Sequence, residues 1–282
     1  MPRSEKPIVV EHIYDKLVDS LTGKLRRRVV TNDDIVDAIR ECKATHGIKL
    51  SENNPANFMK DIIRGRGASG MWPEKLKRDR IGGRQVTGSG NVFEFVPYAD
   101  DQQDPFPTRF GYHPEVQVYR LQSVSIPLAT KALGRDDETY LIQVAKDLGL
   151  VETHFALYSP VKVVELSHLQ IGIKLRLCEV DTMYRAIHED ESGTHQEMII
   201  TAEAKKRNQR ILEEQVVQQV KAAFGATKVN LVVPIAMAAT DKGIYVAEFK
   251  AVTRDQCEAF DTLELVAEVL YELVPALQGI NA

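Results

Sequence analysis

The chain has 282 residues, of which 44% are hydrophobic and 27% charged, which is enough to bury a core in two domains or in one large one. No apolar run approaches the ~20 residues that a membrane-spanning helix needs, and the N-terminus lacks a signal-peptide pattern, so no membrane partner is expected. Cys42, Cys178 and Cys257 are far apart and form no CxxC pair. This argues against a structural zinc site or a disulfide framework and favours a reducing, cytoplasmic location.

The net charge of −4 hides an asymmetry along the sequence. Residues 1–98 carry 18 basic and 13 acidic side chains, a net charge of +5, so the remaining residues carry −9. Between Lys60 and Arg84, eight basic side chains stand against three acidic ones. A basic first part is typical of proteins that bind a polyanion, and an acidic second part can bind divalent cations, although charged runs are more often only solvated faces.

The chain begins with two predicted helices. Apolar residues recur at helical spacing over residues 8–21. A second helix fits residues 34–45, because Thr31 or Asn32 can cap its start and Gly47 can end it.

A third helix and a hairpin follow. Asn54-Pro55 is typical of a helix start, and this helix is expected to end at Gly65. Residues 86–96 predict a hairpin. Helices followed by a hairpin indicate a winged-helix domain over residues 1–98, in which the second helix of the pair enters the major groove of DNA.

The DNA contacts expected in this domain are Lys60, Arg64, Arg66, Lys75, Lys77, Arg78, Arg80, Arg84 and Gln85. Arg84 and Gln85 have the chemistry to read guanine and adenine edges. Arginines beside a hairpin more often contact phosphate, which positions the protein without specifying the sequence.

Residues 99–112 are rich in Asp, Gln and Pro and are expected to link two domains. After them, strands alternate with helices, which predicts an α/β domain with a mixed sheet over residues 113–282. The expected elements are a helix capped by Asp136 or Asp137, strand segments 171–187 and 197–204, a helix over 208–224, strands 229–237 and 244–250, and an amphipathic helix over 257–277.

The pattern acid-x-Lys occurs three times, at Glu41-Cys42-Lys43, Glu203-Ala204-Lys205 and Glu248-Phe249-Lys250. The first lies in a predicted helix, where positions i and i+2 face apart, whereas on a strand residues two apart share a face at ~6.6 Å. Only the second has an acidic partner, Asp181, on the preceding predicted strand. A hairpin with its loop at residues 188–196 would place Asp181 and Glu203 side by side.

The third pattern is the competing site. Its nearest upstream acid, Asp241, lies only seven residues before Glu248 and leaves little room for a paired strand. A purely structural alternative for Asp181, Glu203 and Lys205 is a cross-strand ion pair on the surface of a sheet.

Two carboxylates and a backbone carbonyl can hold Mg²⁺, a hard cation that prefers oxygen ligands. The metal would neutralise charge on a phosphodiester and lower the pKa of bound water, and a lysine would position or deprotonate the attacking water. Asp181, Glu203 and the carbonyl of Ala204 are therefore the expected metal ligands, and Lys205 is the expected catalytic lysine.

Glu179-Val180-Asp181 on a strand, a hairpin, and Ile199-Ile-Thr-Ala-Glu-Ala-Lys205 on the next strand resemble the PD-(D/E)xK nuclease superfamily. The following stretch Asn208–Gln215 strengthens the resemblance, which covers roughly residues 136–250. It implies a core sheet flanked by helices, Mg²⁺-dependent hydrolysis of DNA with Mn²⁺ as a substitute, and 5′-phosphate and 3′-hydroxyl ends. Val180 stands where the name-giving motif has proline, which leaves Glu179 as an alternative or helper to Asp181.

The resemblance also suggests two further catalytic residues. Members often add a glutamate from the helix before the sheet, for which Glu138 is the best match, and many carry a glutamine in the helix after the lysine, for which Gln215 is the candidate. Glu138 could equally be a first-turn acid favoured by the helix dipole, and Gln215 a solvated side chain.

In the N-terminal half, Asn54–Arg64, Met71-Trp-Pro-Glu and Arg84-Gln-Val-Thr-Gly resemble the DNA-reading domain of some type II restriction endonucleases. The leading hypothesis is such an enzyme, part of a restriction-modification system, which cuts both strands of double-stranded DNA as a homodimer because two cuts need two active centres. The alternatives are a modification-dependent or structure-specific DNA nuclease, and a non-catalytic winged-helix DNA-binding regulator.

Overall fold

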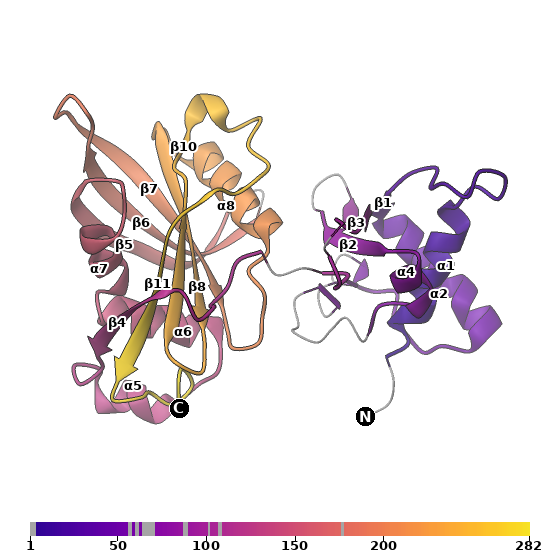
Figure 1. Cartoon of the computed structure of the whole chain (residues 1–282), viewed down its shortest axis with the longest axis horizontal. Coiled ribbons are helices and arrows are strands. Elements are labelled where there is room, and N and C mark those ends of the chain that lie inside the picture. Colours follow the sequence, from indigo (N-terminus) through magenta and orange to yellow (C-terminus); the bar gives the residue numbers. More distant parts are fainter. Residues whose placement is uncertain are drawn as a thin grey trace. The chain divides into compact units, whose positions relative to one another are not determined.

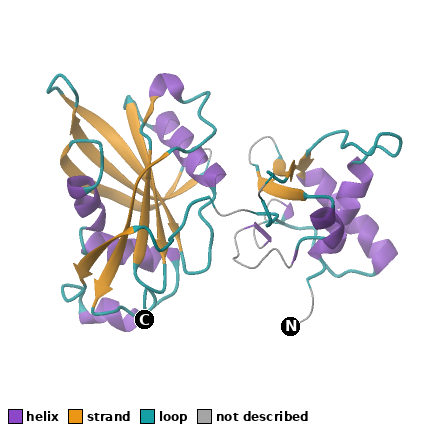
Figure 2. Cartoon of the chain, in the orientation of Figure 1, coloured by secondary structure: helices purple, strands orange, loops and turns teal. Residues whose placement is uncertain are grey.

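The computed structural model describes residues 4–55, 58–59, 62–63, 71–86, 90–100, 102–106, 109–175 and 178–282. The chain divides into two compact units, Met1–Thr108 and Arg109–Ala282. Figure 1 labels their elements and Figure 2 shows their helices and strands. No helix within the described ranges is long and apolar enough to cross a membrane.

The first unit combines helices with a small antiparallel sheet. Its described elements are α1 (Lys6–Leu17), β1 (Val29–Thr31), α2 (Asn32–His46), α4 (Glu74–Arg78), β2 (Ile81–Gln85) and β3 (Asn91–Pro97). The strand order is β1-β3-β2, with both pairs antiparallel. Trp72 lies at the centre of the core, where its ring contacts those of Phe93, Phe95 and Phe106.

Helix α2 begins and ends where its sequence predicts. The Thr31 hydroxyl accepts a hydrogen bond from the Asp34 amide, and the Asp34 carboxylate accepts one from the Thr31 amide at 2.8 Å. Gly47 ends the helix with a left-handed φ of 66°. The third predicted helix, Asn54–Gly65, falls largely on residues 56–57, 60–61 and 64–65, which lie outside the described residues.

Segment 99–112 is packed more closely than a linker needs to be. Phe106 is buried against Trp72 in the first unit, and Phe110 meets Phe249 in the second with ring centroids 4.8 Å apart. The boundary between the units falls inside the segment. The two phenylalanines explain the difference, because each buries a large apolar ring in its own unit.

The second unit is built on a mixed eight-stranded sheet, as far as the described residues go. Its elements are β4 (Gln117–Gln122), α5 (Leu128–Leu133), α6 (Glu138–Asp147), α7 (Leu150–Leu157), β5 (Val163–Lys174), β6 (Glu179–Glu189), β7 (His195–Lys205), α8 (Glu213–Ala226), β8 (Leu231–Ala239), β9 (Ile244–Phe249), β10 (Val252–Thr253), the short 3-10 helix η3 (Arg254–Gln256) and β11 (Leu265–Val274). The strand order is β4-β11-β9-β8-β7-β6-β5, with β10 paired to β8. The pairs β7–β8 and β4–β11 are parallel and the others antiparallel.

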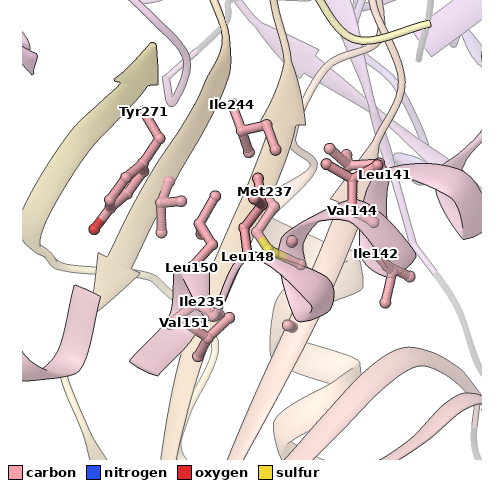
Figure 3. Close-up of a cluster of buried hydrophobic side chains, with 14 of the residues drawn as sticks. Leu141, Ile142, Val144, Leu148, Leu150, Val151, Ile235, Met237, Ile244 and Tyr271 are labelled. Atoms are coloured by element: carbon pink, nitrogen blue, oxygen red, sulfur yellow. The ribbon is translucent and has the colours of Figure 1, made fainter. Parts of the chain in front are cut away.

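Helices cover both faces of this sheet. On one face, α6 and α7 pack against alternate residues of the central strands, and Figure 3 shows part of this core: Leu141, Ile142, Val144, Leu148, Leu150, Val151, Ile235, Met237, Ile244 and Tyr271. On the other face, α8 packs against the remaining residues of the same strands. The predicted α/β class, a mixed sheet flanked by helices, is therefore confirmed.

The predicted C-terminal helix over residues 257–277 is wrong. This stretch contains β11, an inner strand that pairs with β9 on one side and β4 on the other. Val269 and Leu270 are consecutive, and both are buried because one faces each side of the sheet. A strand buried on both faces shows no alternation of apolar and polar residues, so its spacing also fits a helix.

Other elements of the second unit also differ from the prediction. The expected strand over 171–187 is two strands, β5 and β6, and β4, α5 and α7 were not expected from the sequence. The helix before the sheet is α6, and Asp137 caps it by accepting a hydrogen bond from the Tyr140 amide at 2.8 Å.

Candidate active site

The β6–β7 hairpin brings Asp181 next to Glu203. The antiparallel register ends with the pair Thr182–Ala202, and Asp181 and Glu203 are the next residues on the two strands. The Ala204 amide donates a hydrogen bond to Asp181 Oδ2 at 2.8 Å, which holds the half-buried carboxyl group at the end of the hairpin.

Lys205 and helix α8 complete the centre. Glu203 and Lys205 are only 3% and 4% exposed, and the Lys205 ammonium pairs with Glu203 Oε1. The other carboxylate oxygen, Oε2, accepts a hydrogen bond from the side-chain amide of Gln219 on α8. Both glutamate oxygens are thus engaged, and the carboxylate points to the sheet face that α8 covers.

Glu203 makes the neighbouring Asp181 harder to ionise. Burial, followed by the negative charge of Glu203, raises the pKa of Asp181 to about 7, although the Ala204 amide and Lys205 act in the opposite direction. Burial and the same two carboxylates raise the pKa of the neighbouring Cys178 thiol to about 11. The negative charge of Glu203 thus acts on both neighbouring acidic groups.

Oxygen atoms of the kind that bind hard cations lie near Asp181 and Glu203. Besides the two carboxyl groups, Gln219 Oε1 is buried without a hydrogen-bond partner among the described residues. The Ala204 carbonyl points to the same side of β7 as its amide, beyond the last β6–β7 pair. No cluster of three or more His, Cys, Asp or Glu side chains suited to a metal occurs in the described part of the chain.

Neither Glu138 nor Gln215 forms a hydrogen bond or ion pair with Asp181, Glu203 or Lys205 among the described residues. Glu138 is the first residue of α6, which packs on the sheet face opposite to α8. Gln215 lies one turn before Gln219 on α8, and its side-chain oxygen is buried without a hydrogen-bond partner among the described residues.

Gln219 is the residue that the sequence analysis missed. Its signal is a polar side chain among the buried apolar residues of α8, which include Val216, Val220 and Ala223. Because α8 also carries Gln215 and Gln218, the choice among the glutamines depends on the rotation of the helix over the sheet.

The competing residues Glu248 and Lys250 do not converge. Glu248 is fully buried on the α7 side of the sheet, where it binds His154 Nε2 at 3.0 Å and Ser159 Oγ at 2.7 Å. Lys250 is exposed just after β9 ends, and its ammonium pairs with Glu264 at 2.9 Å. Glu248 thus anchors α7 to the sheet.

Comparison of the chain with protein-family profiles, curated proteins and solved structures finds no match.

Most of the expected DNA contacts that are described lie on α4 and β2 of the first unit. Lys75 pairs with Asp15, Lys77 with Glu74 at 2.7 Å, and Arg84 with Glu94 at 2.7 Å. Of the other described candidates, Arg78 is exposed and Gln85 is buried. Arg80 is exposed and donates hydrogen bonds to the carbonyls of Ala99 and Asp100. Lys60, Arg64 and Arg66 lie outside the described residues.

Proposed function

We propose that this protein is a Mg²⁺-dependent deoxyribonuclease with a PD-(D/E)xK centre, and that it acts as a site-specific type II restriction endonuclease. One observation carries the proposal: Asp181, Glu203 and Lys205, from two adjoining strands, meet at one end of the sheet around a pair of carboxyl groups. The structural alternative is an ion pair on the surface of the sheet, and the burial of Glu203 and Lys205 argues against it.

Each residue of the centre has a role in phosphodiester hydrolysis. A Mg²⁺ ion would supply positive charge to the phosphodiester and make water more acidic. Asp181, Glu203 and the Ala204 carbonyl would hold it, and Mn²⁺, which prefers similar oxygen ligands, would substitute. Lys205 would position or deprotonate the attacking water, and Gln219 keeps the Glu203 carboxylate oriented.

The first unit would supply DNA recognition as a winged-helix domain. Support comes from its helices and from its antiparallel sheet with the β2–β3 hairpin. Residues 1–98 carry a net charge of +5, which Asp100, Asp101 and Asp104 reduce to +2 over residues 1–108. A homodimer would bring two centres to one duplex, as cutting both strands requires.

Cleavage of defined DNA substrates tests this function against its alternatives. The purified protein is incubated with unmethylated and methylated plasmid DNA, in Mg²⁺ or in EDTA. Discrete fragments from unmethylated DNA that need Mg²⁺ are expected. Cleavage of methylated DNA alone would favour a modification-dependent nuclease, and tight binding without cleavage of any substrate would favour a DNA-binding regulator.

A further inference from the structure

The loop between β7 and α8 places positive charge directly beside the candidate centre. Lys205 is the last residue of β7, and Lys206, Arg207 and Arg210 follow it before α8 begins at Glu213. Because a strand advances about 3.3 Å per residue, Lys206 and Arg207 lie within about 7 Å of Lys205 along the chain.

The two cations that follow Lys205 differ in their partners from the candidate DNA contacts of the first unit. Within the described ranges, neither Lys206 nor Arg207 forms an ion pair with an acidic side chain. In the first unit, by contrast, Lys75, Lys77 and Arg84 each pair with an Asp or Glu. The loop therefore presents more unneutralised charge than those three candidate DNA contacts do.

The loop is also held in one conformation. Asn208 adopts a left-handed φ of 67°, and the Gln209 amide donates to the Lys206 carbonyl at 3.2 Å. Arg207 Nη2 donates to the carbonyl of the buried Ile280 at 2.5 Å. The same nitrogen also donates to the main-chain oxygen of Ala282 at 3.3 Å, and the guanidinium has further N–H donors on Nε and Nη1 for another acceptor.

We infer that this loop binds the sugar-phosphate backbone of the strand that is cut, with Lys206 and Arg207 contacting the phosphates next to the one at Lys205. The inference rests on the proposed function and adds a DNA contact in the second unit. The ammonium of Lys206 and the guanidinium of Arg207 both have the chemistry to bind phosphate oxygens. Such contacts position the scissile bond and carry no sequence information.

DNA binding in EDTA, which excludes cleavage, tests the inference. Binding of a duplex of about 20 base pairs is measured between about 50 and 200 mM KCl for the wild type, Lys206→Ala, Arg207→Gln and the double variant. Each lost phosphate contact should reduce the slope of log K against log salt by about 0.9. The double variant should therefore lose about 2 from the slope and bind at least several-fold more weakly at 100 mM.

Lys228→Ala is the matched control, because Lys228 is an exposed lysine just beyond the other end of α8 and forms no ion pair with a described residue. It should leave the slope unchanged. Because Arg207 also donates a hydrogen bond to Ile280, its substitution could destabilise the fold, so the melting temperature of each variant is measured as well. Lys206→Glu changes the charge of the loop without removing that hydrogen bond. Lys206→Glu should weaken binding more than Lys206→Ala does.

The outcomes separate the inference from the proposed function. A wild-type slope in the double variant and in Lys206→Glu would overturn the inference, even if the wild type cuts DNA in Mg²⁺. A wild type that binds no DNA would overturn it as well. A reduced slope in a protein that cuts no DNA would support the loop contact and contradict the nuclease.

Discussion

Asp181 and Glu203 form an unfavourable pair in the absence of a cation. One ammonium, Lys205, faces two carboxyl groups, and the pKa of Asp181 rises to about 7 because its charged form is partly desolvated and lies beside Glu203. Such a pair costs stability in the metal-free protein at high pH. A bound divalent cation would relieve that cost, which links the pKa to metal binding.

The stability of the metal-free protein should therefore depend on the ionisation of Asp181. The folded-state pKa lies above the ordinary value, so the folded protein holds the proton more tightly, and stability in EDTA falls as pH rises from about 4 through 7. Asp181→Asn should unfold at a higher temperature than the wild type at pH 8, and this gain should vanish near pH 4. Thermal denaturation in EDTA measures both.

Mg²⁺ should reverse the effect in the wild type. The rise in melting temperature on adding Mg²⁺ should be larger at pH 8 than at pH 6, where protons compete, and Asp181→Asn should show little rise at either pH. An equal Mg²⁺-dependent rise in the variant would show that the ion binds elsewhere.

Gln219 is expected to orient Glu203 rather than to bind DNA. Gln219→Met removes the donor to Glu203 Oε2 with little change in volume, and a hydrogen bond to a charged group is worth about 1.5–3 kcal/mol. The rate of DNA cleavage in Mg²⁺ should fall by about 10-fold or more. Gln218→Met, on the same helix, is the control, because the Gln218 amide contacts only Glu214 among the described residues.

The same assay distinguishes Gln219 from Gln215, the glutamine expected from the sequence. Gln215→Met should have the smaller effect, since Gln219 rather than Gln215 donates the hydrogen bond to Glu203. If Gln215→Met slowed cleavage and Gln219→Met did not, the sequence-based choice would be correct.

At the scale of elements, the sequence predicts what local signals determine. The hairpin that joins Asp181 to Glu203 has alternating strands and a polar loop, and α2 has a capping residue and a terminal glycine, so both follow from neighbouring residues. The contact of Gln219 with Glu203 and the position of Glu138 depend instead on which face of the sheet α8 and α6 cover. That choice is made by contacts between residues far apart in the chain.

The C-terminal stretch shows the same limit. Strand β11 is defined by its pairing with β9 and β4, and its apolar residues on both faces fit a helix equally well in the sequence. Local pattern alone could not have distinguished the two.

A matched pair of leucines tests β11. Leu270 is 1% exposed and packs on the α8 side of the sheet, whereas Leu265, in the same strand, is 38% exposed. Leu270→Ala should lower the free energy of unfolding by about 2–5 kcal/mol, and Leu265→Ala by roughly 1 kcal/mol or less. Urea denaturation measures both, and equal losses would contradict the position of β11 in the sheet.

At the scale of the whole molecule, the two units have separate cores and the proposed chemistry belongs to one of them. Asp181, Glu203, Lys205 and Gln219 all lie within Arg109–Ala282, as does the loop with Lys206 and Arg207. The expected DNA-reading residues lie in Met1–Thr108. Cutting and sequence recognition are thus proposed for different units.

A fragment consisting of residues 109–282 should therefore keep the metal response and lose site preference. Its melting temperature should rise with Mg²⁺ at pH 8 as that of the full chain does, while its affinity for a preferred DNA site should fall to that for unrelated DNA. Calorimetry and competition binding measure the two properties. Loss of the Mg²⁺ response in a folded fragment would mean that the first unit contributes to the metal site.

The central claim is that Lys205, and not Lys250, belongs to the active centre. The rate of Mg²⁺-dependent cleavage of plasmid DNA by Lys205→Ala and by Lys250→Ala, each beside the wild type, tests it most directly. Lys205→Ala should reduce the rate by about 100-fold or more, the size expected when a group that stabilises the transition state is removed, and Lys250→Ala should cut at the wild-type rate because its ammonium lies on the surface with Glu264. Loss of cleavage in Lys250→Ala with retention in Lys205→Ala, or no cleavage by the wild type, would contradict the claim.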